Sequence, residues 1–217
     1  QTLLDGIHRY TYYYGGAHDK FGQKAIDYIM DCLGEDFYPT ERGYGWFVSW
    51  YQYIEHRNIN SANVEYVWAY YYDIIQNANL ILANIDNIQV VDAQIPLKNN
   101  IKAQALTYRA FSHYMLVQLY GDRYDYNPGA ANSHPGVRIK LVPDAEPLPR
   151  STVAQVYTQV KKDLTDALAL LANSSEILIF CFWRRFYRFR RAHGERLFKV
   201  FVVATVTAFN TVRRQEE

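Results

Sequence analysis

Residues 35–53 combine carboxylates, an arginine and several aromatic rings, which are side chains that bind carbohydrates without breaking bonds. The flat faces of Tyr and Trp pack against the C–H face of a pyranose, while neighbouring carboxylate and guanidinium groups hydrogen-bond its hydroxyls. The segment therefore predicts a platform on which a sugar stacks. The candidate ligand-binding residues are Asp36, Glu41, Arg42, Tyr44, Trp46 and Trp50.

The same rings have an alternative role, which is to fill a core. Trp50 and Tyr53 are three residues apart, as on one face of a helix, and this spacing favours burial of both. Trp46 lies between Gly45 and Phe47, in a segment rich in glycine. Exposure with ligand contact and burial therefore both stay open for Trp46.

Glu35, Asp36 and Glu41 are the acids nearest to these rings, and a glycosidase requires two carboxylates about 5–9.5 Å apart. We favour a solvated turn or a hydrogen bond to a ligand, and keep a hydrolase that uses Glu35 or Asp36 as an alternative. The chain has no Gly-x-Ser-x-Gly nucleophile motif and no glycine-rich phosphate loop. Nucleophilic hydrolase chemistry of this type is therefore disfavoured, and we expect no nucleotide cofactor.

The histidines and cysteines give no support to a metal site or a disulfide framework. The six His never form a His-x-x-x-His pair or a His/Cys cluster, and Cys32 and Cys181 lie far apart in the sequence. His113 falls inside a predicted helix, where we expect a satisfied core or interface histidine. We expect no metal and no other cofactor.

The composition is that of a globular protein with an excess of tyrosine. Of the 217 residues 49% are apolar and 21% are charged, and the formal net charge is +1. No global field therefore attracts nucleic acid or an anionic membrane. Aromatic residues reach 16%, with 20 Tyr, and tyrosine suits amphipathic surfaces because it joins an apolar face to a polar tip. The composition favours recognition.

The composition changes abruptly near residue 173. Residues 1–173 hold 14 Lys and Arg against 18 Asp and Glu, with 19 Tyr and 4 Phe, whereas residues 174–217 hold 9 against 4, with one Tyr and 7 Phe. The basic-aromatic run 184–191 has the side chains that stack on nucleic acid, but it lies only in this segment, so we expect no nucleic-acid partner. We divide the chain into a helical domain, 1–173, and an atypical tail, 174–217.

Two long helices are predicted in the middle of the chain. Over 64–88 apolar residues recur at three- and four-residue spacing, which gives one amphipathic face. A second helix over 98–120 ends at Gly121, and its second half is apolar nearly all round, so it should be the most buried element. The expected fold class is all-α.

A third helix is predicted after a long loop. Thr152 and Gln155 form a capping box at the start of 152–171, where Val and Leu make an apolar stripe. Five prolines make 121–150 an irregular loop. Two antiparallel helices and a third at a distance indicate tetratricopeptide-like helical hairpins with long irregular loops. Shorter helices are predicted over 2–14 and 22–30.

Three segments match, in order, the motifs of one known family. Residues 67–85 resemble a Trp-x₃-Tyr-x₂-Ile-x₂-Ala-Asn helix, and 103–122 resemble a Glu-Ala-x₃-Arg-Ala helix that ends in Tyr-Gly-Asp. Residues 149–157 resemble a Pro-Arg-Ser-Thr-Val-x₂-Val-Tyr element. On these motifs, 1–173 is similar to the N-terminal portion of the SusD/RagB family of outer-membrane nutrient-binding lipoproteins.

The resemblance implies a SusD-like helical region that is not an enzyme and that binds oligosaccharides or other nutrients at the cell surface. Family members are lipid-anchored to the Gram-negative outer membrane and lid a SusC-like TonB-dependent transporter, so the resemblance implies this location and this partner. A structural helical-repeat interaction module that binds no small ligand is the alternative function.

The chain departs from the family pattern in three places. The lipobox cysteine and its lipid anchor would precede Gln1, and an Arg-Tyr pair follows Gly121 and Asp122 where the family has a Val/Ile-Pro-Leu run. After Asn173 the family continues with a second repeat helix and a long C-terminal half. We therefore expect an N-terminal portion with an aberrant end, in which 177–183 lies against the Val and Leu face of the third helix.

The hairpin of residues 64–121 and the helix of 152–171 are predicted to form the scaffold and the transporter-facing surface. Burial of Leu106, Met115 and Val160 is the corresponding packing expectation. Residues off the apolar stripes are expected to contact other helices or the partner barrel: Tyr70, Tyr72, Gln76 and Asn79.

Overall fold

The regular structure of the protein is helical in the part of the chain that the computed structural model describes. The described residues are 1–13, 15–34, 36–40, 45–127 and 129–171. Within them the β-pairing is one isolated bridge between Pro135 and Thr152, and the remaining regular structure consists of α- and 3₁₀-helices. The predicted all-α class is confirmed. The tail 174–217, with its expected packing of 177–183, lies outside the described residues.

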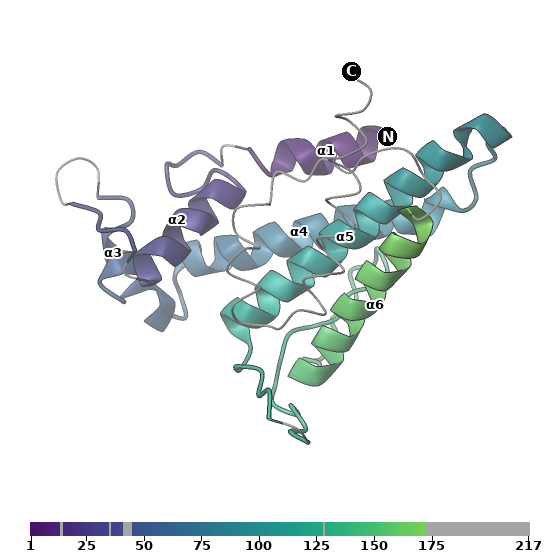
Figure 1. The fold of residues 1–217 in the computed structure, drawn as a ribbon. Helices are drawn as coiled ribbons and strands as arrows, with labels where there is room; N and C mark the ends of the chain where they lie inside the picture. The colour runs from purple at the N-terminus through teal and green to yellow at the C-terminus, as the bar shows by residue number, and fades with distance from the viewer. Residues whose placement is uncertain (14, 35, 41–44, 128, 172–217) are drawn as a thin grey trace, which may run out of the picture. The chain divides into compact units, whose positions relative to one another are not determined.

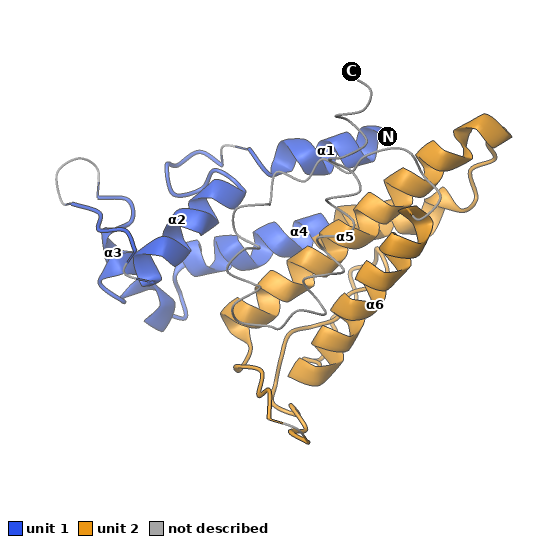
Figure 2. Ribbon diagram, in the orientation of Figure 1, with its two compact units in different colours: residues 1–74 blue, residues 75–217 orange. Residues whose placement is uncertain are grey.

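The chain divides into two compact units, residues 1–74 and 75–217, and Figure 2 shows the boundary inside the long helix α4, Ala62–Ile85. The elements of the first unit before α4 are α1 (Thr2–Tyr10), α2 (Gln23–Leu33), α3 (Val48–Tyr51) and the 3₁₀-helix η1 (Glu55–Arg57). Leu4 and Ile7 form the buried face of α1, and α2 buries Ala, Ile and Cys side chains at helical spacing.

Helix α1 ends at Tyr10, so the prediction that it continues to Tyr14 is wrong. The Thr11 hydroxyl donates to the carbonyl of His8 at 2.7 Å, and the Thr11 carbonyl accepts the N–H of Gln23 at 3.1 Å. Gly22 has φ +66° there, and a Cβ on it would lie 2.2 Å from the Thr11 oxygen. The contact with the start of α2, which only glycine permits, therefore stops α1 early.

The second unit is built on α5 (Ile95–Tyr120) and α6 (Val153–Leu171), which lie side by side and antiparallel in Figure 1. The 3₁₀-helix η2 (Asp92–Gln94) leads into α5, and the described residues 121–127 and 129–150 contain no helix, in agreement with the loop predicted over 121–150. The packed apolar residues at one end of the unit are Leu82, Ala103, Leu106, Ala167, Leu170 and Leu171. None of the described helices has the length and apolarity needed to cross a bilayer.

The predicted helix ends of this unit are set by local chemistry. The N–H of Thr152 donates to Gln155 Oε1 at 2.8 Å and the N–H of Gln155 donates to Thr152 Oγ1 at 3.2 Å, which confirms the capping box. Gly121 ends α5, and a Cβ on it would lie 2.7 Å from the Val117 oxygen. Helix α5 starts earlier than predicted, at Ile95, because Pro96 is accommodated in its first turn.

One buried polar network joins the three motif helices. Arg109 donates from Nε and Nη2 to the two oxygens of Asp163, at 2.8 and 2.7 Å, and from Nη1 to Asn79 Oδ1 at 3.0 Å. Asn79 Nδ2 in turn donates to the carbonyl of Lys140 at 3.1 Å. Arg109 and Asp163 are both buried, and their bidentate pairing compensates the charge of each. These motif residues stabilise the scaffold.

His113 is a core histidine, as expected, and its exposed fraction is 0%. Its Nε2 accepts the N–H of Lys140 at 3.2 Å, so the proton is on Nδ1, which donates to the carbonyl of Arg109 at 3.0 Å. Burial lowers the pKa of His113 to about 4, so the ring is neutral at pH 7.

The packing expectations for the scaffold are largely confirmed. Leu106, Met115 and Val160 are buried, as predicted. Tyr70 and Asn79 are also buried within the chain, so the contact expected of them is internal and is not made with a partner barrel.

Candidate functional site

Aromatic rings gather around α2 and α3 of the first unit. Because α2 turns its Ile face inward, Tyr28 lies on its outer face, 42% exposed. The Tyr28 ring centroid lies 6.1 Å from that of Phe21, 5.9 Å from that of Phe37 and 5.9 Å from that of Phe47. These spacings are those of tilted aromatic contacts, which hold the four rings as one cluster.

Two further aromatic pairs adjoin this cluster. Tyr38 is 63% exposed and meets Tyr51 edge to face at 4.9 Å, and Trp46 is 38% exposed with its ring 5.5 Å from that of His18. Tyr38 follows Phe37, and Trp46 precedes Phe47, so the pairs are joined to the cluster through the backbone. We call this set the aromatic surface: His18, Phe21, Tyr28, Phe37, Tyr38, Trp46, Phe47 and Tyr51.

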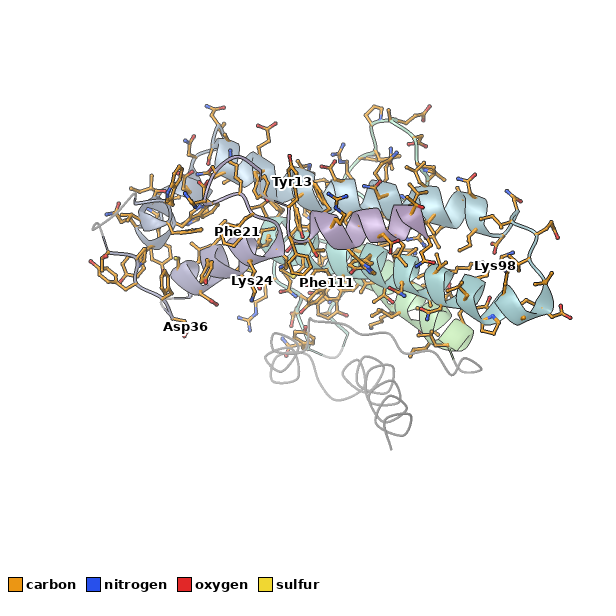
Figure 3. The ribbon with its side chains drawn as sticks, turned by 90° about the horizontal axis from the view of Figure 1, so that it is seen from above. Tyr13, Phe21, Lys24, Asp36, Lys98 and Phe111 are labelled. Atoms are coloured by element: carbon orange, nitrogen blue, oxygen red, sulfur yellow. The ribbon has the colours of Figure 1, made fainter. Side chains whose placement is uncertain are left out.

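Asp36 places a carboxylate at one end of this surface. The backbone N–H groups of Asp36 and Phe37 both donate to the carbonyl of Asp31, at 3.0 and 3.2 Å, and fold the chain back after α2. Phe21 and Asp36, labelled in Figure 3, stand before and after α2. The surface therefore offers ring faces with an exposed carboxylate beside them, which suits a ligand with both C–H faces and hydroxyls.

The predicted site residues differ in their exposure to solvent. Asp36 and Trp46 are exposed, as a ligand platform requires. Trp50 is 4% exposed, which confirms its predicted core role, and the prediction that it stacks on a ligand is wrong. Tyr53 is half-buried and its hydroxyl donates to the carbonyl of Leu33 at 3.1 Å. The remaining predicted residues, Glu35, Glu41, Arg42 and Tyr44, lie outside the described residues.

Phe21 and Tyr28 were not identified from the sequence. The signal that would have found Tyr28 is an aromatic residue on the polar face of an amphipathic helix, where a ring has no core to enter. Nowhere in the described part of the chain do three His, Cys, Asp or Glu side chains gather as metal ligands would.

Two cavities are lined by residues that do not belong to the aromatic surface. One of about 610 Å³, at the end of α1 in the first unit, is lined by Gly6, Arg9, Tyr10, Tyr12 and Tyr13. The other, of about 380 Å³, is in the second unit and is lined by Arg123, Tyr124, Asp125, Tyr126 and Asn127. Neither cavity was predicted from the sequence, although each lining combines tyrosines with an arginine.

The sequence model of a SusD-like family, described as starch-binding associating with outer membrane, matches residues 15–184. A solved structure of a SusD-like carbohydrate binding protein from Bacteroides vulgatus is 25% identical, with a TM-score of 0.62 over 78% of this chain and 34% of that one. A SusD superfamily protein from Bacteroides thetaiotaomicron is 29% identical, with a TM-score of 0.57 over 82% of this chain and 37% of that one.

A second Bacteroides vulgatus protein, 24% identical, has a TM-score of 0.63 over 82% of this chain and 37% of its own, and shows the fold alone. The chain spans 34–37% of the length of these solved structures. No match was found among the curated proteins.

Proposed function

The chain belongs to the SusD-like family of starch-binding proteins associated with the outer membrane, and from this premise we propose that it binds oligosaccharides without cleaving them, on the aromatic surface of its first unit. The observation that carries the proposal is the exposure of Tyr28, Phe37, Tyr38 and Trp46 as large rings beside Asp36. A sugar presents a C–H face to such rings and hydroxyls to the carboxylate.

The arrangement of the rings supports a preformed site. Tyr28 is held by three ring contacts and Tyr38 by Tyr51, so both side chains are already oriented before a ligand arrives. Preorganised rings lose little conformational entropy on binding. Glu41, Arg42 and Tyr44 remain proposed ligand residues.

As part of the same proposal, the protein is lipid-anchored at the outer-membrane surface and delivers the bound glycan to a SusC-like TonB-dependent transporter. This part rests on the family. The absence of catalysis also belongs to the proposal. Incubation with the bound glycan should release no shorter product, and release that depends on Asp36 would favour the hydrolase alternative.

Titration calorimetry across a panel of neutral oligosaccharides that includes maltoheptaose tests the binding site. Each stacked ring contributes about 0.5–1.5 kcal/mol beyond burial, so Tyr38→Ala and Trp46→Ala should each weaken binding about 2- to 13-fold. Tyr38→Phe and Trp46→Phe are matched controls that keep a ring and should retain most of the affinity. Equal affinity of the Ala and Phe variants would refute the stacking role, and no heat with any glycan from the folded protein would refute the function.

A further inference from the structure

The cavity at the end of α1 has walls that the fold holds in place. The Tyr10 hydroxyl donates to Asp73 Oδ2 at 2.7 Å, and the Tyr10 ring is stacked at 17° on Tyr70, with centroids 5.3 Å apart. Tyr70 is fully buried. Burial and the neighbouring Asp73 raise the pKa of Tyr10, so its phenol stays protonated and continues to donate.

The stack continues from the core to the surface. The Tyr13 ring, labelled in Figure 3, also stacks on Tyr10, with an interplanar angle of 17° and ring centroids 6.1 Å apart. Tyr12 and Tyr13 are 68% and 61% exposed. Large rings that are exposed in this way beside a cavity are characteristic of recognition sites.

The floor of the cavity is opened by a glycine. Gly6 lies within α1, and a Cβ built on it meets no atom within 4 Å. The cavity of about 610 Å³ falls in the size range of about 300–1,000 Å³ that small-ligand sites occupy. Arg9 is the charged residue of its described lining, and its guanidinium supplies up to five N–H donors for hydroxyls.

We propose that this cavity is a second carbohydrate-binding site, in which a short oligosaccharide stacks on Tyr12 and Tyr13 and accepts hydrogen bonds from Arg9. The inference rests on the proposed function for the class of its ligand, but on different residues for the site. It makes the first unit bivalent for glycan.

Gly6 gives a test that leaves the walls intact. Gly6→Trp places an indole in the open space and should weaken binding of maltoheptaose at this site at least about tenfold, whereas Gly6→Ala adds one methyl group and should change it less than about twofold. Tyr12→Ala is a second variant that removes a stacking ring from an exposed position. Calorimetry of each is done in the full chain and again in a Tyr38→Ala/Trp46→Ala background, which removes two exposed stacking rings from the aromatic surface.

The design separates the two sites. Binding of maltoheptaose that persists in the Tyr38→Ala/Trp46→Ala background and is lost on adding Gly6→Trp or Tyr12→Ala supports the second site. Binding abolished by Tyr38→Ala/Trp46→Ala and unaffected by Gly6→Trp and Tyr12→Ala overturns the second site and leaves the proposed function standing. Failure of the folded wild-type chain to bind any glycan of the panel overturns both.

Discussion

The buried imidazole of His113 should make the stability of the second unit depend on pH. Its Nε2 accepts the N–H of Lys140, and its Nδ1–H donates to the carbonyl of Arg109. Protonation at Nε2 would break the first of these bonds and place a positive charge in a buried position next to the Arg109 guanidinium. The folded state therefore resists the proton that the unfolded state accepts.

The magnitude follows from the two pKa values. The pKa of His113 falls from 6.5 in the unfolded chain to about 4 in the folded one, and one pKa unit corresponds to about 1.4 kcal/mol. The stabilisation by the neutral ring is complete above about pH 6.5 and is lost as the pH falls toward 4. The expected loss is about 3 kcal/mol.

The assay is urea unfolding of the wild type and of His113→Gln, followed by helical circular dichroism at a series of pH values from 7.5 to 4. Because the other titrating groups are common to both proteins, the difference between the two curves isolates His113. We expect the wild type to lose about 3 kcal/mol relative to the variant over this range. Parallel curves, or an NMR titration of the His113 ring with a pKa near 6.5, would refute the reasoning.

Three further predictions concern the scaffold. Arg109→Met leaves Asp163 as an unpaired buried carboxylate and should cost about 3–5 kcal/mol in chemical unfolding, while Arg109→Met/Asp163→Leu should cost less than Arg109→Met alone; additive costs would contradict the pairing. Gly121→Ala should lower the free energy of unfolding by about 1–3 kcal/mol because its Cβ would lie 2.7 Å from the Val117 oxygen. Gly6→Ala should instead stabilise α1 by about 0.5–1 kcal/mol. Equal melting temperatures of the Gly121→Ala and Gly6→Ala variants would contradict this. Truncation after Asn173 should retain helix content and glycan binding, and loss of binding with the fold retained would show that 174–217 carries function.

The helix ends that the sequence predicted well are those that depend on a few neighbouring residues. The capping box of Thr152 and Gln155 forms within one turn, and Gly121 ends α5 through a contact with Val117, four residues away. The end of α1 was predicted wrongly because Thr11 is held by Gln23, a contact that no local pattern contains.

The position of each aromatic ring depended on packing. Trp46 and Trp50 are four residues apart and equally hydrophobic, yet one is exposed and the other is buried, because α3 turns only Trp50 toward the core of the first unit. The sequence left both exposure and burial open for Trp46, and the fold decided that it is exposed. Phe21 and Tyr28 joined the site through contacts between segments.

The sequence by itself determined the helices, their main boundaries, the family motifs and the richness in exposed aromatic residues, since helical periodicity and capping are properties of adjacent residues. Only the tertiary structure decided that Asn79, Arg109 and Asp163 share one buried network, and that Tyr10 stacks on both Tyr13 and Tyr70. Asn79, Arg109 and Asp163 lie far apart along the chain, as Tyr70 does from Tyr10 and Tyr13, and these contacts exist because burial of the apolar helix faces brings the residues together.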